Sequence, residues 1–173
     1  MNHIIIEGFM GSGKSTVGKA LARELQLPLI NIDKRVSTKL KMKPAEIYDH
    51  YGEVYYRAME TCILADLLEL HERSVVLLGS GLATMPQNEA YLKKLGKVYY
   101  LKAGKPTILE RLRKGDKSSW LKSGDLAERV DKMLEEREPS YKKVADRIIE
   151  TDGKSTEEIV REILAADEAF AKA

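Results

Sequence analysis

The chain has little of what a secreted or membrane protein needs. One of its 173 residues is a cysteine, so no internal disulfide can form, which predicts a reducing compartment. Its apolar runs extend over only a few residues, whereas about 20 are needed to cross a bilayer. No basic segment followed by an apolar run opens the sequence. We therefore expect a cytoplasmic location and no membrane partner.

An excess of either charge is also lacking. The chain has 29 basic and 27 acidic residues, for a net charge of +2, and the two signs are interleaved. This balance argues against a general nucleic-acid binder. Repeats and low-complexity segments are not found either. We expect a monomer with one domain over residues 1–173 and a small molecule as its partner.

The single cysteine, Cys62, falls within an apolar helical pattern of Met59, Ile63, Leu67 and Leu70. This spacing predicts a small thiol packed in the core. The alternative, a catalytic nucleophile, needs a His and Asn arrangement that the sequence does not offer around it.

Short β-branched runs alternate with longer segments of helical period, which is typical of βαβ units around a parallel sheet. The predicted fold class is α/β, a three-layer sandwich with five buried strands at residues 3–6, 29–33, 74–78, 97–101 and 147–150. Helical spacing predicts helices at residues 14–25, 45–51, 53–70, 84–95, 106–113 and 126–136, and a terminal helix from Ser155.

Two segments do not fit a plain alternation. Residues 34–62 are too long for a simple crossover, which indicates an inserted substrate-binding segment. Residues 114–125 are rich in Gly, Ser, Asp and Lys, which is typical of a mobile lid. Trp120 lies in this lid, either as a packing residue at a hinge or as a ring that closes over substrate.

Residues 8–15, with the sequence GFMGSGKS, fit the Walker A pattern between a strand and a helix. The glycines let successive N–H groups converge on an anion, and the helix dipole adds to them. We expect Gly11, Ser12, Gly13 and Thr16 to bind the phosphates of ATP, Lys14 to follow the transferred group, and Ser15 to ligate Mg²⁺. A plain glycine-rich turn is the alternative.

Other candidates lie at strand ends, where ligands of open α/β sheets collect. Asp33 can orient an acceptor hydroxyl and take its proton, or cap a helix. Arg57 can bind an anion or pair with Glu60 on the surface. The turn Gly79-Ser80-Gly81 leaves room for a ligand, and Arg137 closes a helix.

Together these residues resemble the shikimate kinase family from Ile4 to about Thr151. The matching stretches are GFMGSGKSTVG, the segment G-E-x-x-Y-R-x-x-E at residues 52–60, the Gly79–Gly81 turn, and Arg137-x-Pro-x-Tyr with the following Ala-Asp-x-Ile-Ile-x-Thr. The resemblance implies strand order 2-3-1-4-5, a lid over ATP, and transfer of its γ-phosphoryl group to shikimate.

The resemblance also implies roles for individual residues. Asp33 should bind ring hydroxyls, Arg57 and Arg137 should clamp the carboxylate, and the backbone of Gly79, Ser80 and Gly81 should contact the ring, since a guanidinium fork suits a carboxylate. Arg113 is expected to stack on adenine.

Three positions depart from the family pattern. Asn31 stands where an Asp is usual, Ser80 replaces a glycine, and the lid has no Arg, so that Lys117 is the candidate for the missing positive charge. Another small-metabolite or nucleoside monophosphate kinase, or a catalytically weak ATP-binding module, therefore stays open as an alternative.

Overall fold

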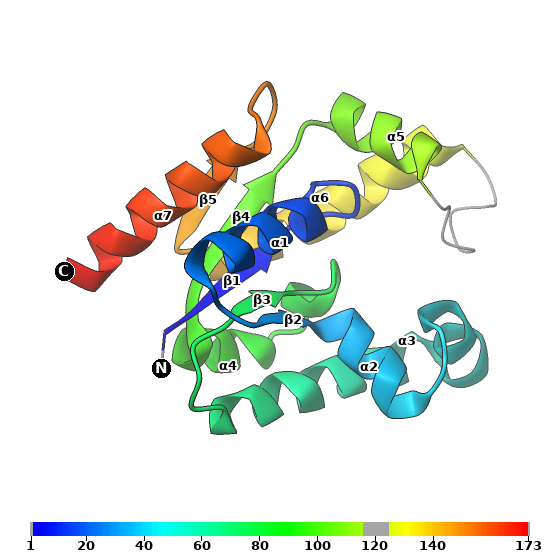
Figure 1. The fold of residues 1–173 in the computed structure, drawn as a ribbon. Coiled ribbons are helices and arrows are strands. Elements are labelled where there is room, and N and C mark those ends of the chain that lie inside the picture. Colours follow the sequence, from blue (N-terminus) through cyan, green and yellow to red (C-terminus); the bar gives the residue numbers. More distant parts are fainter. Residues whose placement is uncertain (1, 116–124, 173) are drawn as a thin grey trace.

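The computed structural model describes residues 2–115 and 125–172 and shows a five-stranded parallel sheet between two layers of helices (Figure 1). The strands are β1 (His3–Glu7), β2 (Leu29–Asn31), β3 (Val75–Leu77), β4 (Gly96–Lys102) and β5 (Arg147–Glu150). Their order is β2-β3-β1-β4-β5, and each pair is parallel. The predicted fold class and strand order are confirmed.

Seven α-helices and two short 3₁₀ helices are described besides the strands. They are α1 (Lys14–Leu25), α2 (Ile32–Leu40), α3 (Pro44–Asp66), η1 (Leu67–Glu69), η2 (Leu82–Thr84), α4 (Asn88–Leu95), α5 (Lys105–Lys114), α6 (Leu126–Val144) and α7 (Thr156–Lys172). None of the described helices has the length and apolar character that a membrane span requires.

The central strand β1 supplies side chains to both faces of the sheet, because successive residues of a strand point in opposite directions. Ile5 packs with residues of α3 and α4, whereas Ile4 and Ile6 pack with residues of α1 and α7. All three isoleucines are fully buried. Both faces of a parallel sheet are therefore covered, and its ligand-binding edge is the one at the carboxyl ends of the strands.

Several boundaries differ from those predicted. Strand β2 ends at Asn31 rather than residue 33, because the Asn31 side chain accepts a hydrogen bond from Lys34 N at 3.0 Å and caps α2. The prediction of helix from residue 84 is wrong before Asn88, since 82–84 form η2. Helix α6 continues through Pro139 to Val144, well beyond the predicted end at residue 136.

The helix that carries Cys62 corrects a second prediction. It runs from Pro44 to Asp66 across a single non-helical residue, Gly52, with φ of 78°. Its apolar face contains Ile63 and Leu64, both buried, whereas Cys62 is exposed. One position along a helix is a rotation of about 100°, which places the thiol outside the core.

The pairing of β1 with β4 predicts that Gly96→Ala is strongly destabilising. Gly96 pairs with His3, and a Cβ atom at residue 96 would overlap the His3 backbone, which cannot rotate away. We expect the free energy of unfolding to fall by about 2 kcal/mol or more. Urea denaturation measures it. Gly115→Ala is the control, because its Cβ would meet only the Arg111 carbonyl at 3.3 Å, a contact that a shift of a few tenths of an ångström relieves; equal effects in the two variants would contradict the argument.

Candidate functional site

The loop between β1 and α1 has the geometry of an anion site. Gly11 and Gly13 adopt φ angles of 75° and 97°, which side-chain-bearing residues avoid. Gly13 is the N-cap of α1 and supplies no side-chain cap. The first amides of α1 are therefore available to a ligand, and the helix dipole favours a negative charge there. Ser15 and Thr16 are exposed, and Ser12 is buried with an unpartnered hydroxyl.

A cavity of about 520 Å³ lies against this loop. It is lined by residues 9–17 together with Asn31, Asp33, Leu77, Leu78, Ser80, Arg111, Lys154, Thr156 and Ile159. The structure thus brings the phosphate-binding loop together with the start of α2 and the turn after β3. The sequence predicts that these segments lie together, because the carboxyl ends of parallel strands share one edge of the sheet.

Lys14 lies over its own loop. Its Nζ donates hydrogen bonds to the carbonyl oxygens of Gly8 at 2.5 Å and Phe9 at 3.0 Å. Burial lowers the pKa of Lys14, while the nearby carboxyl groups of Glu7 and Asp33 act against this shift. Carbonyl oxygens are weaker partners for an ammonium group than phosphate oxygens, so the contact is one that a bound phosphate can replace.

Glu7, the last residue of β1, is fully buried below this loop. One of its carboxyl oxygens accepts a hydrogen bond from Gly8 N at 2.7 Å, and the other has no partner. Burial raises the pKa of Glu7 to about 8, with Lys14 opposing the shift. The sequence signal for this residue is an acidic side chain placed directly between a predicted buried strand and the Walker A glycines.

Asp33 lies in the first turn of α2, close to the turn after β3. Its Oδ1 accepts a hydrogen bond from the Tyr56 hydroxyl at 2.7 Å. A Cβ atom at residue 79 would overlap Asp33 Oδ1 and Glu60 Oε1. Two carboxyl groups therefore lie directly against the Gly79 backbone, and glycine is required there by the close approach.

Arg57 is 6% exposed and bound on several sides. Its Nη1 donates to Glu60 Oε2 at 2.5 Å, and its Nη2 donates to the Tyr48 hydroxyl at 2.7 Å. The guanidinium carbon lies 6.0 Å from the Tyr48 ring and 5.6 Å from the Tyr56 ring. A Cβ at Gly81 would overlap this guanidinium. The predicted pair with Glu60 is therefore present, but it is buried, and its expected place on the surface is wrong.

Glu60 completes this buried cluster and was considered in the sequence only as a partner of Arg57. Its side chain is fully buried and its Oε1 has no hydrogen-bond partner. Burial raises the pKa of Glu60 to about 7, although the Arg57 charge counteracts the shift. The tyrosines Tyr48 and Tyr56 were also missed, since aromatic residues on an apolar helix face are more often plain core.

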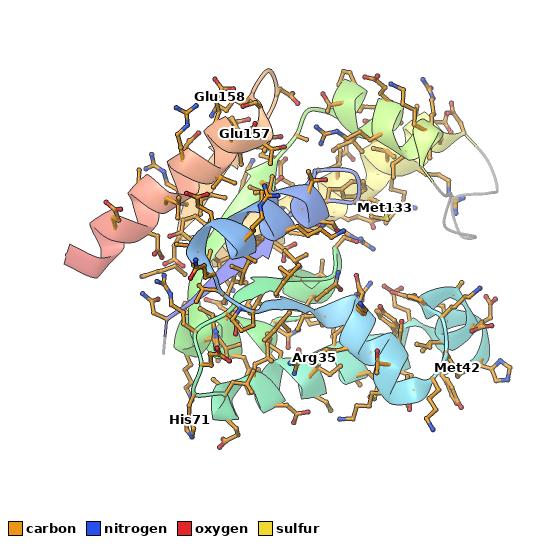
Figure 2. The ribbon with its side chains drawn as sticks, viewed as in Figure 1. Arg35, Met42, His71, Met133, Glu157 and Glu158 are labelled. Carbon is orange, nitrogen blue, oxygen red and sulfur yellow. The ribbon has the colours of Figure 1, made fainter. Side chains whose placement is uncertain are left out.

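Arg137 reaches the same turn from α6. Its Nη1 donates a hydrogen bond to Ser80 Oγ at 2.9 Å. A second cavity, of about 460 Å³, is lined by Tyr48, Glu53, Thr84, Met133, Glu136 and Arg137. Met133 and Arg137 both belong to α6, which passes behind α1 in the view of Figure 2. The two arginines thus meet the β3 turn at Gly81 and at Ser80, from different helices.

The structure favours Arg111 over Arg113 at the nucleotide cavity. Arg111 Nη1 donates to the Gly11 carbonyl at 3.0 Å. Arg113 is exposed and lines a separate cavity with Lys105 and Pro106. Residues two positions apart point about 200° apart on a helix, and the sequence alone did not reveal which of the two faces the loop. The expected stacking role of Arg113 is not supported by this placement.

Two further expectations concern charge and metal. Lys117, the candidate cation of the lid, lies outside the described residues. Within residues 2–115 and 125–172, no group of three or more His, Cys, Asp or Glu side chains gathers to hold a metal ion. Oxygen donors are nevertheless present at the nucleotide cavity, where Ser15 and Asp33 both line the wall.

Comparisons with known proteins agree with one another. The family model described as shikimate kinase matches residues 10–168. The shikimate kinase of Caldanaerobacter subterraneus is 38% identical over 168 residues, covering 96% of both chains. That of Hahella chejuensis is 35% identical over 162 residues, covering 94% of this chain and 84% of the relative.

Solved structures give the same result. A shikimate kinase from Acinetobacter baumannii in complex with shikimate superimposes with a TM-score of 0.91 at 28% identity, covering 98% of this chain and 94% of that one. A gluconokinase from Sinorhizobium meliloti has a TM-score of 0.65 at 19% identity, covering 99% of this chain and 94% of that one, and shares the fold alone.

The buried Glu7 predicts a pH-dependent stability. Because its pKa is about 8 in the folded protein and about 4.3 in an unfolded chain, ionisation between these values favours unfolding. The free energy of unfolding should fall by up to about 1.4 kcal/mol per pH unit across this window. Glu7→Gln keeps the acceptor for Gly8 N and should lose this slope in urea denaturation at pH 5, 6.5 and 8.

Glu60 also makes the free energy of unfolding fall as the pH rises, up to about pH 7. It is present in both the wild type and Glu7→Gln. The difference between Glu7→Gln and the wild type isolates Glu7. Glu24→Gln, on an exposed position of α1, serves as the matched control. Parallel curves for Glu7→Gln and the wild type would show that Glu7 does not hold a proton in the folded state.

Proposed function

The chain belongs to the shikimate kinase family, and from that premise we propose that it transfers the γ-phosphoryl group of ATP to a shikimate hydroxyl, giving shikimate 3-phosphate. The observation that carries this proposal is the meeting of two arginines from different helices, Arg57 and Arg137, at a glycine-lined turn beside a phosphate-binding loop. A carboxylate with hydroxyls nearby is the ligand that such a site suits.

ATP is the phosphoryl donor of this family. We place its phosphates against the amides of residues 11–16, with Lys14 exchanging the carbonyls of Gly8 and Phe9 for phosphate oxygens. We place the base beside Arg111 and Lys154, which line the same cavity. Arg111, already fixed to the Gly11 carbonyl, takes the stacking role that the sequence analysis assigned to Arg113.

Magnesium fits the same cavity, because the Ser15 hydroxyl and the Asp33 carboxylate offer hard oxygen donors. When bound, the ion neutralises charge on the transferred group. Asn31, which replaces a carboxylate at this edge, caps α2 with its side-chain oxygen. We propose Ser15 as the direct ligand and Asp33 as the carboxylate nearest to it.

We propose Asp33 as the proton acceptor. As the shikimate oxygen bonds to the γ-phosphorus, the bond from that phosphorus to the ADP oxygen breaks, and the hydroxyl proton passes to the Asp33 carboxylate. The Tyr56 hydroxyl, which donates to Asp33 Oδ1, orients the carboxylate. Lys14 stabilises the charge on the transferred group, and Lys117 of the lid remains a predicted second cation.

The acceptor lies between α3, the turn after β3, and α6 in this proposal. Gly79, Ser80 and Gly81 present backbone to the ring, apart from the Ser80 carbonyl, which accepts a hydrogen bond from the Tyr141 hydroxyl. Arg57 offers a guanidinium whose other contacts, Glu60 and Tyr48, fix its plane. Residues 34–62, which include most of α2 and 19 of the 23 residues of α3, act as the acceptor-binding segment, and residues 114–125 act as the lid.

The acceptor assignment predicts the effect of Arg57 variants. In a coupled assay of ADP release, shikimate should be turned over in preference to quinate, gluconate and nucleoside monophosphates. Arg57→Lys keeps the charge beside Glu60 but loses the fork, and should lower kcat/KM for shikimate by about 100-fold with ATP affinity retained. Arg57→Ala should lose more, because it also leaves Glu60 without its partner.

Arg23→Ala, at an exposed position in the last turn of α1, is the matched control and should leave kcat/KM at the wild-type value. Lys14→Ala should abolish transfer to every acceptor. Wild-type kcat/KM in Arg57→Lys would remove the carboxylate clamp from the proposal. ATP binding without any shikimate-dependent ADP release by the wild type would favour a non-catalytic module instead.

The nucleotide assignment predicts a difference between two neighbouring arginines. Arg111→Ala removes the side chain that lines the phosphate-loop cavity and should raise the Kd for ADP by about 3- to 10-fold. Arg113→Ala, in the same helix turn but on another cavity, should leave the Kd within about twofold. Isothermal calorimetry measures both, and the reverse ranking would restore the role first assigned to Arg113.

A further inference from the structure

The turn after β3 is held to α6 through one residue, Ser80. The Ser80 hydroxyl accepts a hydrogen bond from Arg137 Nη1 at 2.9 Å, and its backbone carbonyl accepts one from the Tyr141 hydroxyl. Arg137 and Tyr141 are four residues apart on α6, so both project from one face of the helix. Tyr141 is fully buried, which makes this attachment rigid.

Ser80 is the one position of the three-residue turn where the surroundings admit a side chain. A Cβ atom at Gly79 would overlap Asp33 and Glu60, and one at Gly81 would overlap Arg57. The side chain of Ser80 instead points at Arg137. Residue 80 is therefore the position of this turn at which a side chain can contact Arg137.

The two arginines at this turn are held by different chemistry. Arg57 is bound by the carboxylate of Glu60 at 2.5 Å, which compensates much of its charge. Arg137 is bound by the neutral Ser80 hydroxyl, which fixes the direction of the guanidinium without neutralising it. A guanidinium has five N–H donors, so its contacts with Ser80 and with the Tyr141 hydroxyl leave an edge of the fork for another acceptor.

We propose that Ser80 is a positioning residue that acts through Arg137: its hydroxyl fixes the guanidinium toward the acceptor's carboxylate and thereby sets the affinity for carboxylate-bearing acceptors. This inference rests on the proposed function. Its physical basis is conformational entropy. A long side chain that is already ordered before the ligand arrives does not lose this entropy when the ligand binds. It assigns the Ser80 side chain to Arg137 rather than to the shikimate ring.

The test compares shikimate with its methyl ester, which keeps the ring and hydroxyls but has no charged carboxylate. Binding to the ADP complex is measured by calorimetry for the wild type, Ser80→Ala and Ser80→Thr. Ser80→Ala should raise the Kd of shikimate by about 3- to 10-fold and change that of the ester by less than about 1.5-fold. Ser80→Thr keeps the hydroxyl and should restore most of the shikimate affinity.

Thr107→Val is the control, because it removes a hydroxyl that donates to Asp152 Oδ1 on another part of the chain, outside the proposed acceptor site. An equal loss for shikimate and its ester in Ser80→Ala would overturn the proposal, since it would indicate direct contact with the ring or general damage. An unchanged Kd for both ligands would also overturn it. Failure of the proposed function shows separately, as wild-type protein that binds these ligands without releasing ADP in the transfer assay.

Discussion

The close packing of charged side chains against the glycine turn at residues 79–81 is the constraint on which the rest of the site depends. Asp33 and Glu60 lie against Gly79, and the Arg57 guanidinium lies against Gly81. Helices α2 and α3 are thereby held at the carboxyl end of β3, next to the phosphate-binding loop. Without such an approach, the groups proposed to bind acceptor and nucleotide would belong to separate surfaces of the sheet edge.

This packing concentrates buried charge, which is costly unless each group finds a partner. Arg57 and Glu60 pair with each other, and Tyr48 and Tyr56 cover the guanidinium. Glu7 and Glu60 keep raised pKa values and each retains an unpartnered oxygen. Unsatisfied polar atoms of this kind are typical of functional sites, where the fold tolerates a local loss of stability.

Two departures from the family pattern acquire a physical meaning in the structure. Asn31 accepts a hydrogen bond from the Lys34 amide and caps α2, so that Asp33 lies in the first turn of a helix instead of at the end of a strand. Ser80 joins the β3 turn to Arg137. In both cases a polar side chain orients a neighbouring charged residue. Neither departure removes an element of the site, which agrees with the similarity to shikimate kinases along nearly the whole chain.

Local signals in the sequence were enough for the α/β fold class and the phosphate-binding loop, because a Walker A loop and buried strands depend on residues adjacent in the chain. The strand order came from the family resemblance. The predicted ends of elements were wrong where a single side chain decides the end, as the Asn31 cap does for β2. Contacts between distant segments decided the rest. The rotation of α5 selected Arg111 over Arg113, and that of α3 left Cys62 exposed beside buried Ile63.

The pairing of Ser80 with Arg137 also joins residues 57 positions apart, and no spacing in the sequence specifies it. The sequence by itself therefore determined which chemical groups the chain carries and the edge of the sheet where they collect. Only the tertiary structure decided which of those groups touch, because helix rotation and side-chain packing depend on every neighbouring element at once.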